Sequence, residues 1–102
     1  MLKKESRFIR NDRIVFRPED EGGYLYDPHT ERLQYLNPVG TSVYELCDGR
    51  HPLEAMIGRI SGEFRDVPSD RVREDVDRFL DALLRMDYIR VARTERPEHE
   101  SP

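Results

Sequence analysis

Cys47 and His51 are the pair of side chains whose types and spacing could support nucleophilic catalysis. A thiol four residues before an imidazole could act with it as nucleophile and base if both lay on one helix face. Gly49 lies between them and is expected to end the helix, so the two side chains need not share a face. Cys47 falls on the apolar side of that helix, where a free thiol usually packs as a small hydrophobe. We therefore predict that Cys47 is buried and unreactive.

Neither the histidines nor the carboxylates show the spacing of a metal site or an acid–base pair. His29, His51 and His99 fall in a predicted turn, a link between helices and a polar tail, and one cysteine offers no paired ligand spacing. Asp77 and Asp81 lie one helical turn apart among arginines, which is typical of a solvated face with exposed ion pairs. The sequence thus predicts no catalytic residue, no metal site and no cofactor.

Length and charge limit the classes of partner. The chain has 102 residues, enough for one domain with a modest core. It has 17 basic and 21 acidic residues, and the formal charge of −4 disfavours binding to a phosphate backbone. No apolar run approaches the roughly 18 residues of a membrane span, and the N-terminus has no signal-peptide core. The single cysteine allows no disulfide framework, so we expect a cytoplasmic protein that binds neither nucleic acid nor membrane.

Alternating and helical patterns predict an α+β fold, in which a three-stranded antiparallel sheet is followed by three helices. The strands are predicted at residues 13–17, 24–26 and 32–36. Gly22-Gly23 and Asp27-Pro28 are expected in the turns between them, because glycine permits unusual backbone angles and an Asp side chain can bond forward. A short third strand would therefore lead directly into the helices.

The first helix is expected to begin at Pro38 with the Asn37 side chain as its cap. The second follows the apolar spacing from Leu53 to Phe64, and the third begins near Pro68 and carries a long apolar stripe. Residues 88–91 are predicted as a last short strand or a packed tail.

Composition divides the chain into three parts. We predict a flexible arm over residues 1–12, a folded domain over 13–91 and a disordered tail over 92–102, because both ends are polar and lack an apolar pattern.

A winged helix-turn-helix also consists of three helices and a small sheet, so a DNA-binding regulator is the alternative function. The third helix would then be the recognition element. It carries Glu74 and four aspartates beside its arginines, whereas a helix that enters a phosphate-lined groove is expected to be more basic. The charge pattern therefore disfavours DNA binding.

Six short blocks carry a resemblance to a known family. They are Phe16-Arg17-Pro18, Tyr24-Leu25-Tyr26-Asp27-Pro28, Leu36-Asn37-Pro38-Val39-Gly40, Leu46-Cys47-Asp48-Gly49, Asp75-Val76-Asp77-Arg78-Phe79-Leu80-Asp81-Ala82-Leu83 and Asp87-Tyr88-Ile89. At this spacing the chain resembles, over about residues 13–90, the PqqD-like family of RiPP recognition elements, named for a protein of pyrroloquinoline quinone biosynthesis. The resemblance implies a winged-helix-like domain that binds the leader of a ribosomally made precursor peptide. It also implies that the leader is presented to a maturation enzyme, often a radical-SAM protein.

Two positions depart from the family pattern. Tyr44 stands where the family often has tryptophan, and its hydroxyl needs a partner. Asp87 stands where the family often has glycine, so the third helix must end without the residue best suited to a left-handed conformation. Both departures leave the expected fold intact.

The resemblance places the leader as an added strand beside the third sheet strand, in a groove bordered by the third helix. The residues support this, because a short last strand exposes unpaired N–H and C=O groups that can template a further strand. The predicted peptide-binding residues are Arg32, Leu33, Gln34, Tyr35 and Leu36 on the strand and Val72, Asp75, Val76 and Phe79 on the helix. Most of the helix stripe must also build the core, so which of its residues line the groove stays open, as do the precursor, the pathway and the oligomeric state.

Overall fold

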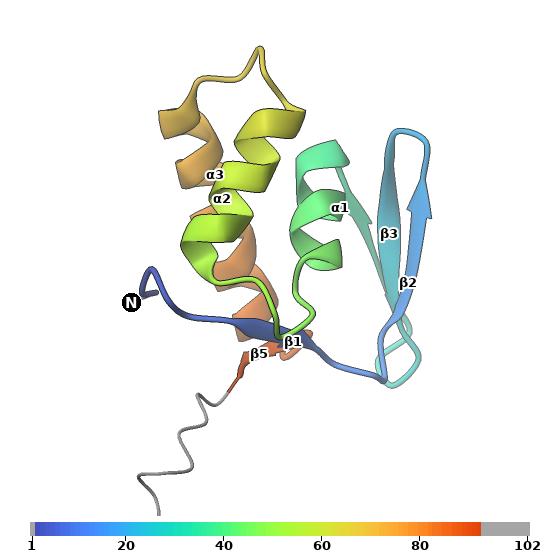
Figure 1. The fold of residues 1–102 in the computed structure, drawn as a ribbon. Coiled ribbons are helices and arrows are strands. Elements are labelled where there is room, and N and C mark those ends of the chain that lie inside the picture. Colours follow the sequence, from blue (N-terminus) through green and yellow to red (C-terminus); the bar gives the residue numbers. More distant parts are fainter. Residues whose placement is uncertain (1, 93–102) are drawn as a thin grey trace, which may run out of the picture.

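A three-stranded antiparallel sheet and three helices form the two layers of the fold (Figure 1). The computed structural model describes residues 2–92. The elements are β1 (Phe8–Arg10), β2 (Val15–Glu19), β3 (Gly22–Asp27), β4 (Arg32–Leu36), α1 (Pro38–Glu45), α2 (Leu53–Glu63), α3 (Ser69–Arg85) and β5 (Ile89–Val91). This architecture confirms the predicted α+β class.

Helix α1 begins where the sequence predicts and connects the two layers. The Asn37 side-chain oxygen accepts a hydrogen bond from the Gly40 N–H at 2.8 Å, and Pro38 occupies the first helical turn, where its missing N–H leaves no bond unmade. Strand β4 ends at Leu36, so the chain passes from sheet to helix through a single residue. Figure 1 shows α1 between the sheet and the other two helices.

The two adjacent glycines lie in a strand, so the prediction that Gly22-Gly23 forms a turn is wrong. They begin β3, and the turn before them is the two residues Asp20 and Glu21. Gly22 has φ 112°, a conformation that favours glycine. A Cβ at Gly23 would lie 2.6 Å from the Arg17 carbonyl oxygen, because the chain passes very closely there. Close backbone approach, rather than turn formation, thus explains the pair.

The N-terminal segment is docked, so the predicted flexible arm over residues 1–12 is wrong for most of its length. Phe8 is fully buried, and β1 pairs with β5 in an antiparallel ribbon. Further backbone bonds run from the Arg10 N–H to the Cys47 carbonyl and from the Gly49 N–H to the Phe8 carbonyl. These partners lie far along the chain, so local composition gives no sign of them.

The C-terminal end of the described chain is a short strand. The sequence predicts either a strand or a packed tail over residues 88–91, and Ile89–Val91 forms the strand β5. The Ala92 N–H donates to the Arg7 carbonyl at 2.8 Å, which holds one residue of the expected tail against the N-terminal segment. The rest of that tail, residues 93–102, lies outside the described residues.

One hydrophobic core lies between the helices and the inner face of the sheet. Its fully buried members include Phe8, Leu25, Val43, Met56, Ile60, Val72, Val76 and Leu80. The α3 stripe predicted from helical spacing supplies three of these, so the long helix is placed by its apolar face. Within residues 2–92, no helix combines the length and hydropathy needed to cross a membrane.

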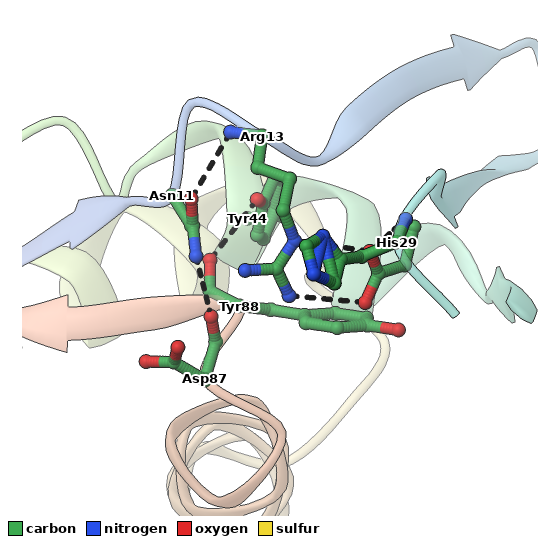
Figure 2. Close-up of polar contacts among 7 residues, drawn as sticks. Asn11, Arg13, His29, Tyr44, Asp87 and Tyr88 are labelled. Carbon is green, nitrogen blue, oxygen red and sulfur yellow. Dashed lines mark hydrogen bonds and ion pairs between the residues drawn. The ribbon is translucent and has the colours of Figure 1, made fainter. Parts of the chain in front are cut away.

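A cluster of polar contacts ties the end of α3 to the rest of the fold (Figure 2). Asp87 ends the helix in a left-handed conformation, φ 64°, and its carbonyl accepts from the Asn11 side-chain amide at 2.8 Å. The buried Tyr44 hydroxyl donates to the Tyr88 carbonyl at 3.2 Å. Tyr44 and Asp87, the two residues that depart from the family pattern, thus both make hydrogen bonds to distant segments of the chain.

An ion pair between Arg13 and Asp27 completes this cluster. Two guanidinium nitrogens of Arg13 each lie 3.0 Å from a carboxylate oxygen of Asp27, whose side chain is only 2% exposed. The His29 N–H also donates to Asp27 at 2.9 Å, which is the forward bond expected of the Asp27-Pro28 turn. The Arg13 hydrogen bonds hold the pKa of Asp27 well below its usual range.

We expect Arg13→Ala to lower the Tm at pH 7 more than Arg73→Ala does. The first change leaves the Asp27 carboxylate without its guanidinium, whereas the second breaks an exposed pair between Arg73 and Glu54. Because the folded-state pKa of Asp27 is lowered, the pair stabilises the fold above the unfolded carboxyl pKa of about 4 and stops doing so as the pH falls further.

Thermal melts by circular dichroism between about pH 7 and about pH 2 test this expectation, since the Asp27 carboxyl of the unfolded chain titrates in that range. The Tm gap between the wild type and Arg13→Ala should narrow below about pH 4. A gap of constant size across the range would contradict the assigned role of Asp27.

Candidate functional site

Strand β4 is an open edge of the sheet. Its bounds, Arg32–Leu36, are those predicted from the sequence, and among the described residues it pairs only with β3. Leu33 is 47% exposed and Tyr35 is 72% exposed. An uncovered edge of this kind offers backbone N–H and C=O groups to an incoming strand.

The pairing between β2 and β3 shows which way the backbone groups of β3 point. In antiparallel strands, pairs that exchange two hydrogen bonds alternate with pairs that exchange none. Pro18 has no N–H and stands opposite Gly23, which identifies this as a pair without bonds. The neighbouring pair, Glu19 with Gly22, flanks a two-residue turn and is the bonded type. Gly23 and every second residue after it therefore direct their backbone groups toward β4.

The same alternation assigns the backbone groups of β4. Leu36 stands opposite Gly23 and Gln34 opposite Leu25, so these two residues of β4 bond inward to β3. Leu33 and Tyr35 alternate with them, and their N–H and C=O groups point to the open side. The free edge thus offers two donor–acceptor pairs, one at Leu33 and one at Tyr35.

A groove lies beside the end of β4, against α3. It has a volume of about 390 Å³ and is lined by Asn37, Arg71, Asp75, Arg78, Phe79 and Ala82. Phe79 reaches it because residue 40 is glycine: a Cβ at Gly40 would lie 2.6 Å from the Cε1 and Cζ atoms of the Phe79 ring. Phe79 and Ala82 supply apolar surface, and the other four residues are polar or charged.

The charged residues of the groove form a small network along α3. Asp75 lies 4.0 Å from Arg71 and 3.6 Å from Arg78, measured between carboxylate oxygen and guanidinium nitrogen. The arginine side chains are 63% and 73% exposed, whereas Asp75 is 26% exposed. Two guanidiniums against one carboxylate leave this side of the groove positively charged. The groove thus suits a peptide with an apolar side chain near an acidic one.

The structure separates the predicted helix residues into two sets. Asp75 and Phe79 line the groove, but Val72 and Val76 are fully buried in the core, and we leave these two out of the site. Their spacing is that of the stripe by which α3 packs on the domain, so no solvent-facing side remains for a peptide. On the strand, Leu36 is 7% exposed and likewise belongs to the core.

Four groove residues were not predicted from the sequence: Asn37, Arg71, Arg78 and Ala82. A signal for the three on α3 does exist, since positions 71, 75, 78, 79 and 82 recur at helical spacing beside the core stripe. The sequence indicates only a helix-capping role for Asn37. Asn37 also lines the groove, because α1 begins beside it.

The cysteine that could have served as a nucleophile is buried, as predicted. The Cys47 side chain is inaccessible, its thiol lies 3.2 Å from the Val43 carbonyl oxygen, and burial raises its pKa to about 12. His51 Nδ1 lies 3.0 Å from the Asp48 carboxylate. A neutral thiol within the core does not act as a nucleophile.

The comparison with protein families decides the affiliation of the chain. A family model described as "Coenzyme PQQ synthesis protein D (PqqD)" matches residues 22–89, about two thirds of the sequence. The chain belongs to this family. The match runs from the first residue of β3 to the first residue of β5 and includes the open edge and the groove. It confirms the family indicated by the six sequence blocks.

A solved structure with the same fold is titled "TbiB1 in Complex with the TbiA(beta) Leader Peptide". Its TM-score is 0.69 at 22% sequence identity, and the alignment covers 84% of this chain and 99% of TbiB1. The likeness establishes a shared fold over most of the chain. No curated protein matches this chain.

Proposed function

We propose that this protein binds the leader segment of a ribosomally made precursor peptide as a strand added to β4. The observation that carries the proposal is the open β4 edge, with two outward donor–acceptor pairs beside the α3 groove. The similar structure of TbiB1 was solved with a leader peptide, which supports a peptide ligand for this fold. PqqD-family membership supports the same function.

Strand addition divides recognition between backbone and side chains. Hydrogen bonds to Leu33 and Tyr35 would accept almost any sequence, because every residue except proline carries both backbone groups. Selectivity would come from leader side chains that enter the groove at Phe79 and meet the guanidiniums of Arg71 and Arg78. The leader would therefore be held in one register by its side chains and bound mainly through its backbone.

We further propose that the protein is not an enzyme and delivers the leader to a maturation enzyme in the cytoplasm. A radical-SAM enzyme is the partner class that the family resemblance suggests. A flexible leader must be ordered on binding, so a Kd of about 1 μM is expected. With a typical association rate, this Kd corresponds to release at about 1 s⁻¹, which allows the leader to be handed on.

The charge arrangement on α3 argues against the alternative of a DNA-binding regulator. Each arginine of the helix lies near a carboxylate: Arg71 and Arg78 at Asp75, Arg73 at Glu54 and Arg85 at Asp81. Guanidiniums that already face carboxylates neutralise phosphates less effectively. The described surface of α3 thus lacks the basic stripe expected of a recognition helix.

Isothermal calorimetry tests the proposed function. The probes are synthetic peptides that carry the N-terminal segments of the short open reading frames beside the gene, with shuffled sequences as controls. One of them should bind with a Kd of about 1 μM, and its shuffled version should not bind. An absence of heat for all of them at high concentration would contradict leader binding.

A further inference from the structure

The side of the sheet that faces away from the helices is largely apolar and uncovered. This outer face carries five apolar or aromatic residues, Val15, Tyr24, Tyr26, Leu33 and Tyr35, together with Arg17 and Glu19 of β2. Side chains alternate along a strand, so these residues share one side, whereas Leu25 and Leu36 point to the opposite side and are buried. No helix of the described chain packs on the outer face.

The strand register arranges the outer face in two rows. One row runs Val15, Tyr26, Leu33, and the other runs Arg17, Tyr24, Tyr35. The Tyr24 and Tyr35 rings meet edge to face, with centroids 6.0 Å apart. The Tyr35 ring thus contacts Tyr24 on one side only. Its side chain is 72% exposed, because the row ends at the open edge of β4.

A strand added to β4 would continue both rows. Leu33 and Tyr35 are the two residues whose backbone groups would face the added leader strand. Two leader residues would therefore lie directly opposite them. Residues opposite each other in neighbouring strands have Cβ atoms about 5 Å apart and lie on the same side of the sheet. The leader residue between these two would point the other way, toward the groove at Phe79.

We propose that the leader is read on both faces of its strand. Two alternate leader residues with aliphatic or aromatic side chains would pack on Leu33 and Tyr35, and the residue between them would enter the groove. This inference rests on the proposed strand addition and specifies the substrate class: a segment that is apolar on both faces. An amphipathic segment would leave Tyr35 exposed in the complex.

Leader recognition fits the outer face better than a sheet-to-sheet dimer does, because exposure is greatest at the edge that strand addition would extend. The exposed fraction is 42% at Val15 on the far edge and 72% at Tyr35 on the β4 edge, and the two middle residues, Tyr24 and Tyr26, are half-buried. A partner that covered the whole face would also cover the charged side chain of Arg17, on the edge strand β2. A leader residue beside Tyr35 meets no charged side chain of the outer face across the strand.

A display library of random 12-residue peptides tests the inference. It is selected separately on the wild-type protein, on Tyr35→Thr and on Val15→Thr. Val15→Thr is the control, because it places the same residue on the same face at the far edge of the sheet, where no leader strand would add. Threonine favours strands, so both variants should keep the fold, and thermal melts check this.

Peptides enriched on the wild type and on Val15→Thr should be apolar at three successive positions. On Tyr35→Thr the apolar preference should vanish at one outward position only, and a peptide selected on the wild type should bind about fivefold more weakly. If the peptides selected on the wild type and on Tyr35→Thr have identical residue preferences, the leader is not recognised on both faces of its strand. This result would not contradict strand addition to β4. A failure of all three selections would instead contradict the proposed function. A dimer that both variants abolish in sedimentation would assign the face to a second copy and also overturn the inference.

Discussion

Tyr35→Pro is expected to weaken leader binding by about tenfold or more while the Tm stays close to that of the wild type. The Tyr35 N–H points to the open side of β4, so its loss removes no bond within the domain. Proline is tolerated on an edge strand when its nitrogen faces outward. In the complex, the same change leaves one leader carbonyl without a donor.

Gln34→Pro is the matched variant with the opposite expectation. The Gln34 N–H bonds inward to Leu25, so proline there removes a ladder bond and should cost about 1–3 kcal/mol of folding free energy. For a domain of this size, that is a Tm decrease of about 5 °C or more. Tyr35→Thr, which keeps the N–H, separates the backbone effect from the loss of the ring.

Calorimetry with the leader and thermal melts on the three variants check these expectations. If affinity falls only in the variant whose Tm falls, the leader does not add to β4. Equal affinities for Tyr35→Pro and Tyr35→Thr would likewise argue against a bond from the Tyr35 N–H.

Phe8→Ala is expected to destabilise the domain by about 3–5 kcal/mol. The Phe8 ring is fully buried, and its strand is hydrogen-bonded to both β5 and the α1–α2 link. Removing the ring would leave a cavity where the N-terminal segment joins the helical layer. A small domain has only about 5–15 kcal/mol of stability, so much of it would be lost.

Urea denaturation of Phe8→Ala, with Arg7→Ala as control, measures this effect. Arg7 is exposed and its backbone carbonyl, which accepts from Ala92, is unchanged by the substitution. The control should therefore unfold within about 0.5 kcal/mol of the wild type. A similarly small effect for Phe8→Ala would show that the segment is dispensable, as the sequence alone suggested.

The elements that the sequence predicts well are those whose signals are local. Asn37 and Pro38 mark the start of α1 within two residues, and the apolar stripe of α3 extends from Val72 to Leu83. Strand β4 lies between the Asp27-Pro28 turn and that helix start, so both of its ends were correctly placed. The family resemblance then led to the prediction that this strand is the peptide site.

The features that sequence reasoning missed depend on contacts between distant segments. Strand β1 pairs with β5 and bridges to Asp48, which no local pattern of residues 1–12 encodes. The division of α3 between core and groove depends on which side α1 covers, so Val72 and Val76 could not be distinguished from Phe79. Which β4 backbone groups point outward was inferred from Pro18, which lies on β2 at the opposite edge of the sheet. No residue of β4 itself indicates this direction.

Amide hydrogen exchange of the ¹⁵N-labelled protein tests strand addition to β4 most directly. In the free protein, the Leu33 and Tyr35 amides should exchange fast, and the Gln34 and Leu36 amides should be protected by β3. Saturation with the leader should slow exchange at Leu33 and Tyr35 by about tenfold or more and change Gln34 and Leu36 much less. Unchanged exchange at Leu33 and Tyr35 in the saturated complex would contradict the proposed site.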